Sequence, residues 1–343
     1  MHVGFQWGWI RTAAILIFGA NLYLSHMNHL DWSFKTPQVQ VKSLTVNNYI
    51  LSEMSPPEIN HAHQAEKILL SALSSVTKRL KMRGLRRLVR WIYDPDKQAK
   101  NRFVFTIPYE GLKVELDIAY FIEWNLFFFG EYDPGMPQVI KQFVKPGAVC
   151  LDVGAHIGSY TLLMAKEASK VIAVEPLPHL IEKLEANISL NKISNVRILP
   201  IVLSDKPELV NLYYPLNHPV GREGSLYRKN VCVENVEKVQ LEAKTIDQVM
   251  QEENCQRLDF IKIDVEGHEY PILLGGEKSI RKHKPAIIFE YEERTWGNAK
   301  FTFQEVDDFF SKLGYSLHLI KPKRIEKIVG KIPEACNILA LSY

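Results

Sequence analysis

Cysteine is scarce in this sequence, and the spacing of the few cysteines excludes two kinds of site. The chain of 343 residues has four of them, and no two form a C-x-x-C pair. A zinc ribbon and a dithiol redox centre both depend on such pairs, so we expect neither. Separate thiols are typical of a reducing compartment, and we therefore expect a cytoplasmic protein. The four residues are Cys150, Cys232, Cys255 and Cys336.

A strong excess of charge is also missing. The formal net charge is +3 at pH 7, which is small for a nucleic-acid-binding protein, so we expect no nucleic-acid partner. The hydrophobic fraction of 46% and the charged fraction of 24% are typical of a globular protein. The length suits two domains, or one domain of about 200 to 250 residues with extensions.

The N-terminal apolar run is too short to cross a bilayer as a helix. Thr12 to Leu24 has 13 residues, whereas a spanning helix needs about 20. Only Arg11 precedes this run as a charge, and no A-x-A cleavage site follows it. A packed or interfacial helix, a signal anchor and a cleaved signal peptide remain as alternatives. The polar stretch from Lys35 to Asn60 is expected to be a linker.

A basic stretch, residues 78–93, follows the expected linker. Seven of its sixteen residues are Lys or Arg. Leu85, Leu88, Val89 and Ile92 recur at the spacing of one helical face, so the pattern predicts a basic amphipathic helix. Such a helix either contacts an anionic membrane or an acidic saccharide, or packs on the following domain with a solvated charged face. If the first alternative holds, the cytoplasmic protein is also associated peripherally with a membrane through this stretch.

Strand and helix patterns alternate from Ala148 onwards, which predicts an α/β fold with a doubly wound, mostly parallel sheet. The last two strands have no helix between them, which favours an antiparallel hairpin at the sheet edge. Helices are expected at 137–143, 159–167, 177–190, 246–252, from after 268 through 281, and at 303–313. Strands are expected at 103–107 and 112–118 as a lead-in hairpin, then at 148–153, 171–174, 196–203, 239–243, 259–263, 286–289, 316–320 and 338–341.

These patterns divide the chain into three parts. Residues 1–100 form an N-terminal extension, residues 101–147 form the hairpin and an aromatic cover, and residues 148–343 form the alternating domain. We expect the cover, which includes the aromatic segment 121–129, to roof a ligand pocket or simply to close the sheet.

Acidic residues stand repeatedly where the expected strands end. Because ligands of open α/β sheets bind at the carboxyl ends of the strands, these acids predict a site there. Gly154 and Gly158 permit a tight turn after the first strand. Glu175 follows Asp152 by 23 residues, a distance suited to a carboxylate that accepts both hydroxyls of a ribose. The acids are Asp152, Glu175, Asp205, Asp264 and Glu290.

A dinucleotide cofactor fits this turn poorly. The G-x-G-x-x-G pattern beginning at Gly154 would need glycine at positions 156 and 159, where the chain has His156 and Ser159. A pyrophosphate would have less room there. A nicotinamide-dependent oxidoreductase is therefore kept as an alternative function only.

Five motifs follow one another in order along the chain. They are Asp152-Val-Gly-Ala-His-Ile-Gly158, Val174-Glu-Pro176, Leu203-Ser-Asp205, Thr245-Ile-Asp247 and Asp259-Phe-Ile-Lys-Ile-Asp-Val-Glu-Gly-His-Glu269. Together they resemble the motifs of the FkbM family of S-adenosylmethionine-dependent methyltransferases. The resemblance covers roughly residues 125 to 320. It implies a class I methyltransferase fold with a seven-stranded sheet, the cofactor S-adenosyl-L-methionine, and O-methylation of a saccharide, glycolipid or natural product.

The resemblance also implies roles for single residues. Asp152, Gly154, His156 and Gly158 would hold the methionine part of the cofactor, Glu175 the ribose, and Ser204 with Asp205 the adenine. His156 departs from the family pattern, in which a smaller polar residue such as Asn is common.

Three polar residues after the strand 259–263 are the candidates for catalysis. Asp264 is expected in the acceptor site, with Glu266 and His268 as the base or as groups that orient the acceptor. Lys262 should lie on the same face of the strand as Asp264. Two carboxylates without a clear third ligand give no reason to expect a metal. The expected acceptor is a small molecule or glycan, and a non-catalytic, membrane-docked binding module is the second alternative function.

Overall fold

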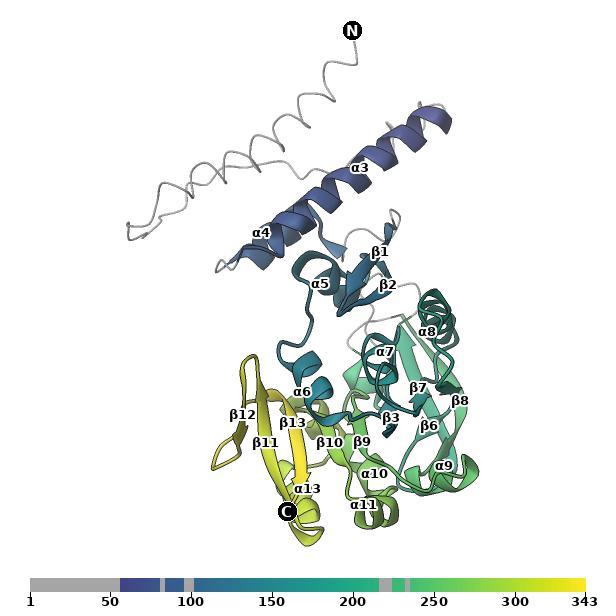
Figure 1. Cartoon of the computed structure of the whole chain (residues 1–343), viewed down its shortest axis with the longest axis vertical. Helices are drawn as coiled ribbons and strands as arrows, with labels where there is room; N and C mark the ends of the chain where they lie inside the picture. The colour runs from purple at the N-terminus through teal and green to yellow at the C-terminus, as the bar shows by residue number, and fades with distance from the viewer. Residues whose placement is uncertain (1–55, 81–83, 96–101, 216–223, 232–234) are drawn as a thin grey trace, which may run out of the picture. The chain divides into compact units, whose positions relative to one another are not determined.

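The computed structural model describes residues 56–80, 84–95, 102–215, 224–231 and 235–343 (Figure 1). The chain forms two compact units, Met1–Lys81 and Met82–Tyr343. The apolar run Thr12 to Leu24 and most of the expected linker lie outside the described residues. Helix α3 (Pro56–Thr77) begins inside the stretch expected to be a linker, so that prediction is wrong for its last residues. Proline is tolerated in the first turn of a helix, where its missing N–H is not needed. Within the described ranges, no helix is both long and apolar enough to cross a bilayer.

The second unit is built around one eight-stranded sheet, in the order β12-β11-β13-β10-β9-β3-β4-β5. Five strands are parallel, and β13, β11 and β12 run antiparallel to their neighbours. The strands are β3 (Val149–Val153), β4 (Lys170–Val174), β5 (Val196–Leu199), β9 (Phe260–Ile263), β10 (Ala286–Glu292), β11 (Tyr315–Lys321), β12 (Arg324–Lys327) and β13 (Ala335–Ser342). The predicted fold class, a doubly wound and mostly parallel α/β sheet, is confirmed.

The sheet differs from the prediction at its antiparallel side. It has eight strands rather than seven, because β12 pairs with β11 after the two-residue connection at Pro322 and Lys323. The predicted antiparallel pairing of the last two expected strands is confirmed, but β13 lies between β10 and β11 and not at the edge. Three of the four residues of the edge strand β12 are charged, which protects an open edge and also hides the strand from a search for apolar segments.

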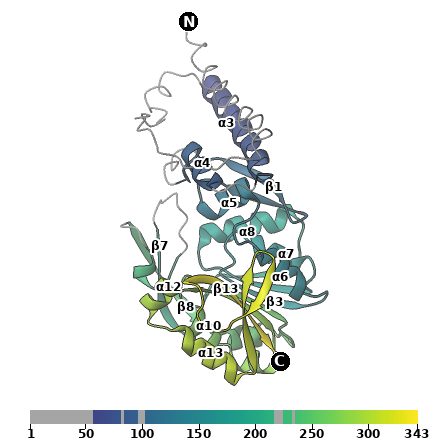
Figure 2. The same cartoon turned by 90° about the vertical axis from the view of Figure 1, so that its left-hand side faces the viewer.

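Helices cover both faces of the sheet, as Figure 2 shows for α6, α7 and α8 on one side and α10 and α13 on the other. Leu151, Ile172, Ile261 and Ile287 of four adjacent strands are fully buried, as expected for parallel strands between two helical layers. The helices are α5 (Phe121–Phe129), α6 (Met136–Phe143), α7 (Ser159–Ala165), α8 (Pro178–Leu190), α9 (Ile246–Glu252), α10 (Glu269–Leu274), α11 (Glu277–His283), α12 (Glu293–Ala299) and α13 (Phe303–Lys312).

A second sheet, in the order β6-β8-β7, corrects the prediction of one strand over 196–203. That segment is two strands, β5 in the main sheet and β6 (Val202–Leu203) in the small one. Pro200 lies between them and has no N–H for a sheet ladder, so the strand pairing ends there. The other members are β7 (Glu208–Pro215) and β8 (Val236–Lys244), which belongs to this sheet and not to the main one.

The helix expected to run from after His268 through Arg281 is interrupted at Gly275 and Gly276, between α10 and α11. A Cβ atom on Gly275 would lie 2.1 Å from the carbonyl oxygen of Ser204. The glycine therefore lets the end of α10 approach the segment that follows β6, at the cost of a continuous helix.

The lead-in hairpin is formed by β1 (Val104–Tyr109) and β2 (Leu112–Asp117) and is confirmed. Glu110 and Gly111 connect the strands with φ angles of 52° and 81°, as a two-residue hairpin turn requires. The aromatic segment that follows forms the helix α5. Ile122 and Leu126 of this helix line the cavity described below, so the aromatic cover contributes to the pocket.

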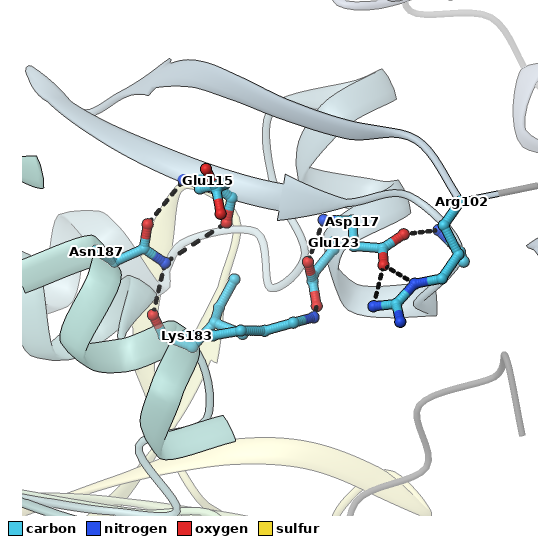
Figure 3. A network of polar contacts seen from close by, with 8 residues as sticks. Arg102, Glu115, Asp117, Glu123, Lys183 and Asn187 are labelled. Atoms are coloured by element: carbon cyan, nitrogen blue, oxygen red, sulfur yellow. Dashed lines mark hydrogen bonds and ion pairs between the residues drawn. The ribbon is translucent and has the colours of Figure 1, made fainter. Parts of the chain in front are cut away.

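Polar side chains attach the hairpin and α5 to helix α8 (Figure 3). Asn187 accepts a hydrogen bond from the N–H of Glu115 at 2.7 Å, and Asn191, one turn later, accepts one from the N–H of Lys113 at 2.8 Å. Each amide also donates to the carbonyl oxygen of the same β2 residue, at 3.5 Å for Asn187 and 2.6 Å for Asn191. Two side chains on a helix thus take the place of a strand partner for β2.

A buried ion pair reinforces this attachment. Lys183 of α8 lies 2.6 Å from the carboxylate of Glu123, which is fully buried in α5. Glu123 also accepts the N–H of Asp117, and the Asp117 carboxylate pairs with Arg102 at 2.5 Å. Burial raises the pKa of Glu123 to about 6 in spite of the neighbouring ammonium group.

The basic stretch does not form the expected helix over 78–93. Helix α3 ends at Thr77, and helix α4 (Leu85–Ile92) begins after Gly84, which has a φ of 86°. The apolar residues of the predicted face do not share one environment, because Val89 is fully buried whereas Leu88 and Ile92 are exposed.

Candidate functional site

A cavity lies where β3, β4 and β9 end at their carboxyl edge. The space between its walls, with the open solvent at its mouth included, is about 950 Å³. The residues around it come from α5, from the turns after these three strands and from the segment around β6. Those used below are Gly154, His156, Tyr160, Glu175, Lys262, Asp264 and His268, with apolar Leu177, Ile201 and Leu203.

The turn after β3 approaches β9 more closely than a residue with a side chain would allow. Gly154 has a φ of 75°, and a Cβ atom there would lie 1.9 Å from the carbonyl oxygen of Asp264. His156 also adopts a left-handed conformation, with a φ of 53°. Burial, with nearby Lys183 and Lys262, lowers the pKa of His156 to about 3, so its ring is neutral at pH 7.

Glu175 follows β4 and faces both the turn and the cavity. Its carboxylate accepts the N–H of His156 at 2.9 Å and the N–H of Leu177 at 3.1 Å, one on each oxygen. Burial raises the pKa of Glu175 to about 7. The residue expected to hold a ribose therefore also organises the turn beside it.

Lys262 of β9 joins the bases of two neighbouring turns. Its ammonium group donates to the carbonyl oxygen of Gly154 at 2.8 Å and lies 3.5 Å from the Asp264 carboxylate and 3.6 Å from that of Asp152. The expectation that Lys262 and Asp264 share a face is confirmed. Asp152 is fully buried and accepts the hydroxyl of Thr161 at 2.6 Å. Asp152 is not one of the described residues that line the cavity, and it contacts the lining residue Lys262 instead.

His268 forms the centre of a hydrogen-bonded chain from the cavity to the surface. Its Nε2 lies 3.0 Å from the Ser204 hydroxyl, and its Nδ1 lies 2.8 Å from the Tyr227 hydroxyl. Ser204 donates its proton to the exposed carboxylate of Asp205 at 3.0 Å, so its oxygen is left to accept from Nε2–H. The Nδ1 atom then accepts from Tyr227. Burial lowers the pKa of His268 to about 4, so the ring is neutral at pH 7.

The turn that holds Asp264 and His268 is fixed by a residue that the sequence did not single out. The fully buried Glu269 accepts the N–H groups of Val265 at 3.0 Å and Gly267 at 3.1 Å. Glu266, between them, has a φ of 57°. Burial raises the pKa of Glu269 to about 7. A carboxylate at the start of a helix that accepts N–H groups of the preceding turn has a recognisable position, but nothing in the sequence shows that it is buried.

The segment before β8 closes over the same turn. Ser225 donates its hydroxyl proton to the carbonyl oxygen of Glu266 at 2.9 Å, and Asn230 donates to the same oxygen at 2.7 Å. Glu266, expected to be a catalytic group, thus contributes its backbone to this contact, and its side chain is not among the described residues that line the cavity.

A second pair missed by the sequence reasoning lies near Asp264. Tyr160 of α7 lines the cavity and donates its hydroxyl proton to Asp133 at 3.1 Å. Burial and the neighbouring Asp264 raise the pKa of Asp133 to about 6. Asp133 lies in the connection between α5 and α6, where only its place after the aromatic segment could have drawn attention to it.

The structure brings half of the expected site residues to the cavity wall. Gly154, His156, Glu175, Asp264 and His268 line it in the part of the chain that the structure describes. Expected residues that lie behind the wall or beside it are Asp152, Gly158, Ser204, Asp205 and Glu266; Glu290 lies within β10 and not after it.

Known proteins resemble the part of the chain that carries this cavity. Residues 152–317 match the model of the methyltransferase FkbM domain. The methyltransferase sdnD of Sordaria araneosa is 30% identical over 152 residues, which cover 36% of this chain and 59% of that protein. The 2-O-methyltransferase NoeI of Sinorhizobium fredii is 21% identical over 169 residues, which cover 46% of this chain and 68% of that protein.

One solved structure extends the comparison. The crystal structure of a methyltransferase FkbM from Methylobacillus flagellatus KT has 15% sequence identity and a TM-score of 0.38, and the match covers 63% of this chain and 52% of that chain. This likeness is weak, and the fold assignment above rests on the strand order. The chain spans less than two thirds of the length of most of the curated relatives that it matches.

Proposed function

We propose that this chain, which belongs to the FkbM methyltransferase family through residues 152–317, transfers a methyl group from S-adenosyl-L-methionine to a hydroxyl oxygen. The acceptor in this proposal is a saccharide, a glycolipid or another natural product. The observation that carries the proposal is the cavity at the ends of β3, β4 and β9, because Glu175, Asp264 and His268 all line it.

The cavity has groups suited to each part of the cofactor. The Glu175 carboxylate keeps a lone pair on each oxygen beyond its two backbone bonds, and these can accept the two ribose hydroxyls. Apolar Ile201 and Leu203 provide surfaces for the adenine ring, and the turn from Gly154 to His156 lies beside Glu175 for the methionine part. The cofactor supplies a methyl group on a positively charged sulfur, which is already a good leaving group.

The remaining task of the chain is to orient the acceptor and take its proton. Asp264 lines the cavity as a carboxylate beside Lys262, and it can accept a hydrogen bond from the acceptor hydroxyl. His268 is neutral, and its chain of hydrogen bonds ends at exposed Asp205.

An oxygen acceptor has support from one relative. NoeI is named as a 2-O-methyltransferase, and the cavity presents carboxylate, hydroxyl and imidazole groups, which suit a hydroxyl donor. Most of the curated relatives match this chain over only part of their length. The acceptor is therefore proposed here and does not follow from the family match.

Binding of S-adenosylhomocysteine, measured by calorimetry, tests the cofactor. We expect saturable binding, weakened about tenfold to a hundredfold in Glu175→Gln, because hydrogen bonds to a charged group contribute about 1.5 to 3 kcal/mol. Gln keeps the size of the side chain and an acceptor oxygen for one of the two backbone N–H groups. Glu185→Gln, on the exposed side of α8, is the matched control and should bind as the wild type does. A preference for NAD, or no binding at all, would contradict the proposal.

Transfer of a labelled methyl group tests the reaction. The full chain is incubated with labelled S-adenosylmethionine and a set of saccharides and glycolipids, and the methylated atom is located by mass spectrometry and NMR. An O-methyl product is the expected outcome. Cofactor binding without transfer to any acceptor would favour a non-catalytic binding module, and methylation of nitrogen would contradict the choice of oxygen.

A further inference from the structure

Helix α4 presents an apolar stripe to solvent. Leu88, Trp91 and Ile92 are 54%, 65% and 47% exposed. They are three and four residues apart, so they lie on one face of the helix. The cavity and its chemistry make no use of these residues.

An adjoining face of α4 packs against the rest of the second unit. Val89 is fully buried, and the ring of the buried Tyr93 lies 6.1 Å from that of Phe103 and 6.4 Å from that of Phe128, centroid to centroid. The indole N–H of Trp124 donates to the carbonyl oxygen of Tyr93 at 3.2 Å. The helix is therefore held in place, and its exposed stripe is not the result of a loose attachment.

Arginines accompany the stripe. Arg87 is exposed next to Leu88 and one turn before Trp91. Arg90 is also exposed, and its Nε lies 3.3 Å from the Asp94 carboxylate. The guanidinium group of Arg86 lies over the ring of Phe129, 5.3 Å from its centroid. Helix α4 itself contains no acidic residue. The face that surrounds the stripe is thus cationic.

We propose that α4 is a docking site for an anionic phospholipid surface. Leu88, Trp91 and Ile92 enter the boundary between headgroups and acyl chains, and Arg87 with Arg90 contacts lipid phosphates. An indole ring suits this boundary because it joins a large apolar surface to an N–H donor. A polyanion such as RNA would pair with the arginines but would gain little from exposed leucine and isoleucine side chains. A lipid surface satisfies both kinds of group.

Sedimentation of the full chain with vesicles tests the proposal. Vesicles of equimolar phosphatidylserine and phosphatidylcholine should bind the wild type, and vesicles of phosphatidylcholine alone should bind it much more weakly. Replacement of Leu88, Trp91 and Ile92 together by serine should lower the apparent partition coefficient at least about a hundredfold, since three large apolar side chains would no longer be buried in the membrane. Arg87→Glu should lower it about tenfold or more.

Matched substitutions elsewhere separate this site from a general effect of charge or apolarity. Leu209→Ser on β7, where the leucine is 67% exposed, and Arg281→Glu on α11, where the arginine is 57% exposed, should leave binding unchanged. Tryptophan emission should shift to shorter wavelength with anionic vesicles, and Trp91→Ala should remove most of the shift.

Several results would overturn the proposal. Absence of binding to anionic vesicles would do so, and so would equal binding by the serine variant, since another segment would then carry the affinity. Binding of RNA in place of vesicles would assign the arginines to another partner. A large fall in the unfolding midpoint of the serine variant would show that part of this chain covers the stripe in solution.

Discussion

The ammonium group of Lys262 donates a hydrogen bond to the carbonyl oxygen of Gly154 over 2.8 Å and so ties β9 to the turn after β3. The side chain of Lys262 is only 4% exposed, and its charge is balanced by Asp152 and Asp264. Two turns that form the floor of the cavity are thus joined through one side chain. Their relative position therefore depends on a buried positive charge.

Replacement of this lysine should destabilise the fold. Lys262→Met keeps most of the volume but leaves the buried Asp152 carboxylate without its cation, which should lower the free energy of unfolding by about 3 kcal/mol. Urea denaturation measures the change. Lys206→Met is the control, because Lys206 is 62% exposed and pairs with Glu208 at 3.4 Å, and it should cost less than about 1 kcal/mol. Equal losses in both variants would argue against the buried role.

Gly154 should tolerate no side chain. Gly154→Ala places a Cβ atom 1.9 Å from the carbonyl oxygen of Asp264, in a backbone with a φ of 75°. Gly147 has a similar φ of 79°, but nothing lies within 4 Å of the new atom there. Gly147→Ala should therefore cost only the backbone strain, about 1 to 2 kcal/mol, and Gly154→Ala at least about 2 kcal/mol more. Unfolding curves of the two variants give the difference directly, and similar values would show that the turn can move away.

Glu269 should make stability depend on pH. Its pKa is about 7 in the folded chain against an ordinary value of 4.5, so the native state binds more protons than the unfolded state between these values. The free energy of unfolding from this group therefore falls as pH rises from about 4.5 to 7. Glu269→Gln removes the charge and keeps an oxygen for the two backbone N–H groups. The variant should match the wild type at pH 5 and be more stable at pH 8 by roughly 1 to 3 kcal/mol.

Comparing the wild type with Glu269→Gln at both pH values also separates Glu269 from groups that change stability with pH in the opposite direction. His156 and His268 have lowered pKa values, so their contribution is lost as pH falls, and it is the same in both proteins. Glu277→Gln on the surface of α11 is the control and should change stability by less than about 0.5 kcal/mol at either pH. If the gap between Glu269→Gln and the wild type does not grow with pH, the carboxyl group is not buried as described.

Asn187 and Asn191 offer a matched pair on one helix. Asn187 is fully buried and also donates to the carbonyl oxygen of Ile157 at 3.0 Å. Asn187→Ala leaves buried backbone groups without partners and should cost about 2 to 3 kcal/mol. Asn191 makes similar bonds to Lys113 in exposed surroundings, where water can replace them, so Asn191→Ala should cost less than about 1 kcal/mol. Thermal unfolding separates the two, and a reversed order would exclude burial as the reason.

The parallel part of the fold could be predicted because its strands are short, apolar and bounded by glycine, proline or an acid. The bounds of α9 agree with the prediction, and those of β3, β4 and β9 differ from it by one residue. Prediction failed where one residue changes the outcome. Pro200 divides one apolar run between two sheets, and Gly275 divides one helix into two. Both residues were visible, but their effect depends on neighbours distant in sequence.

The site could be predicted only where a strand end fixes the position of a side chain. Glu175 and Asp264 lie at the cavity for that reason. Asp133 and Tyr227 come from connecting segments without a repeating pattern, so sequence spacing cannot place them. The polar surroundings of His268 likewise depend on β6 and the segment before β8, which meet only in the folded chain.

The orientation of helix α4 could not be predicted from its sequence either. The spacing of Leu88, Val89 and Ile92 predicts one apolar face, which either contacts a membrane or packs on the following domain. In the folded chain the helix is turned so that only Val89 points inward. Periodicity describes which residues share a face, but the packing of Tyr93 decides where that face points.

The amide contacts of Asn187 and Asn191 leave the hairpin outside the ladder of the main sheet. A segment joined in this way can be lengthened, shortened or exchanged without a shift in the register of β3, β4 or β9, whose ends carry the cavity. Helix α5, which follows the hairpin, lines that cavity through Ile122 and Leu126. The architecture therefore permits one wall of the cavity to be replaced as a module, while the strand ends beneath it stay as they are.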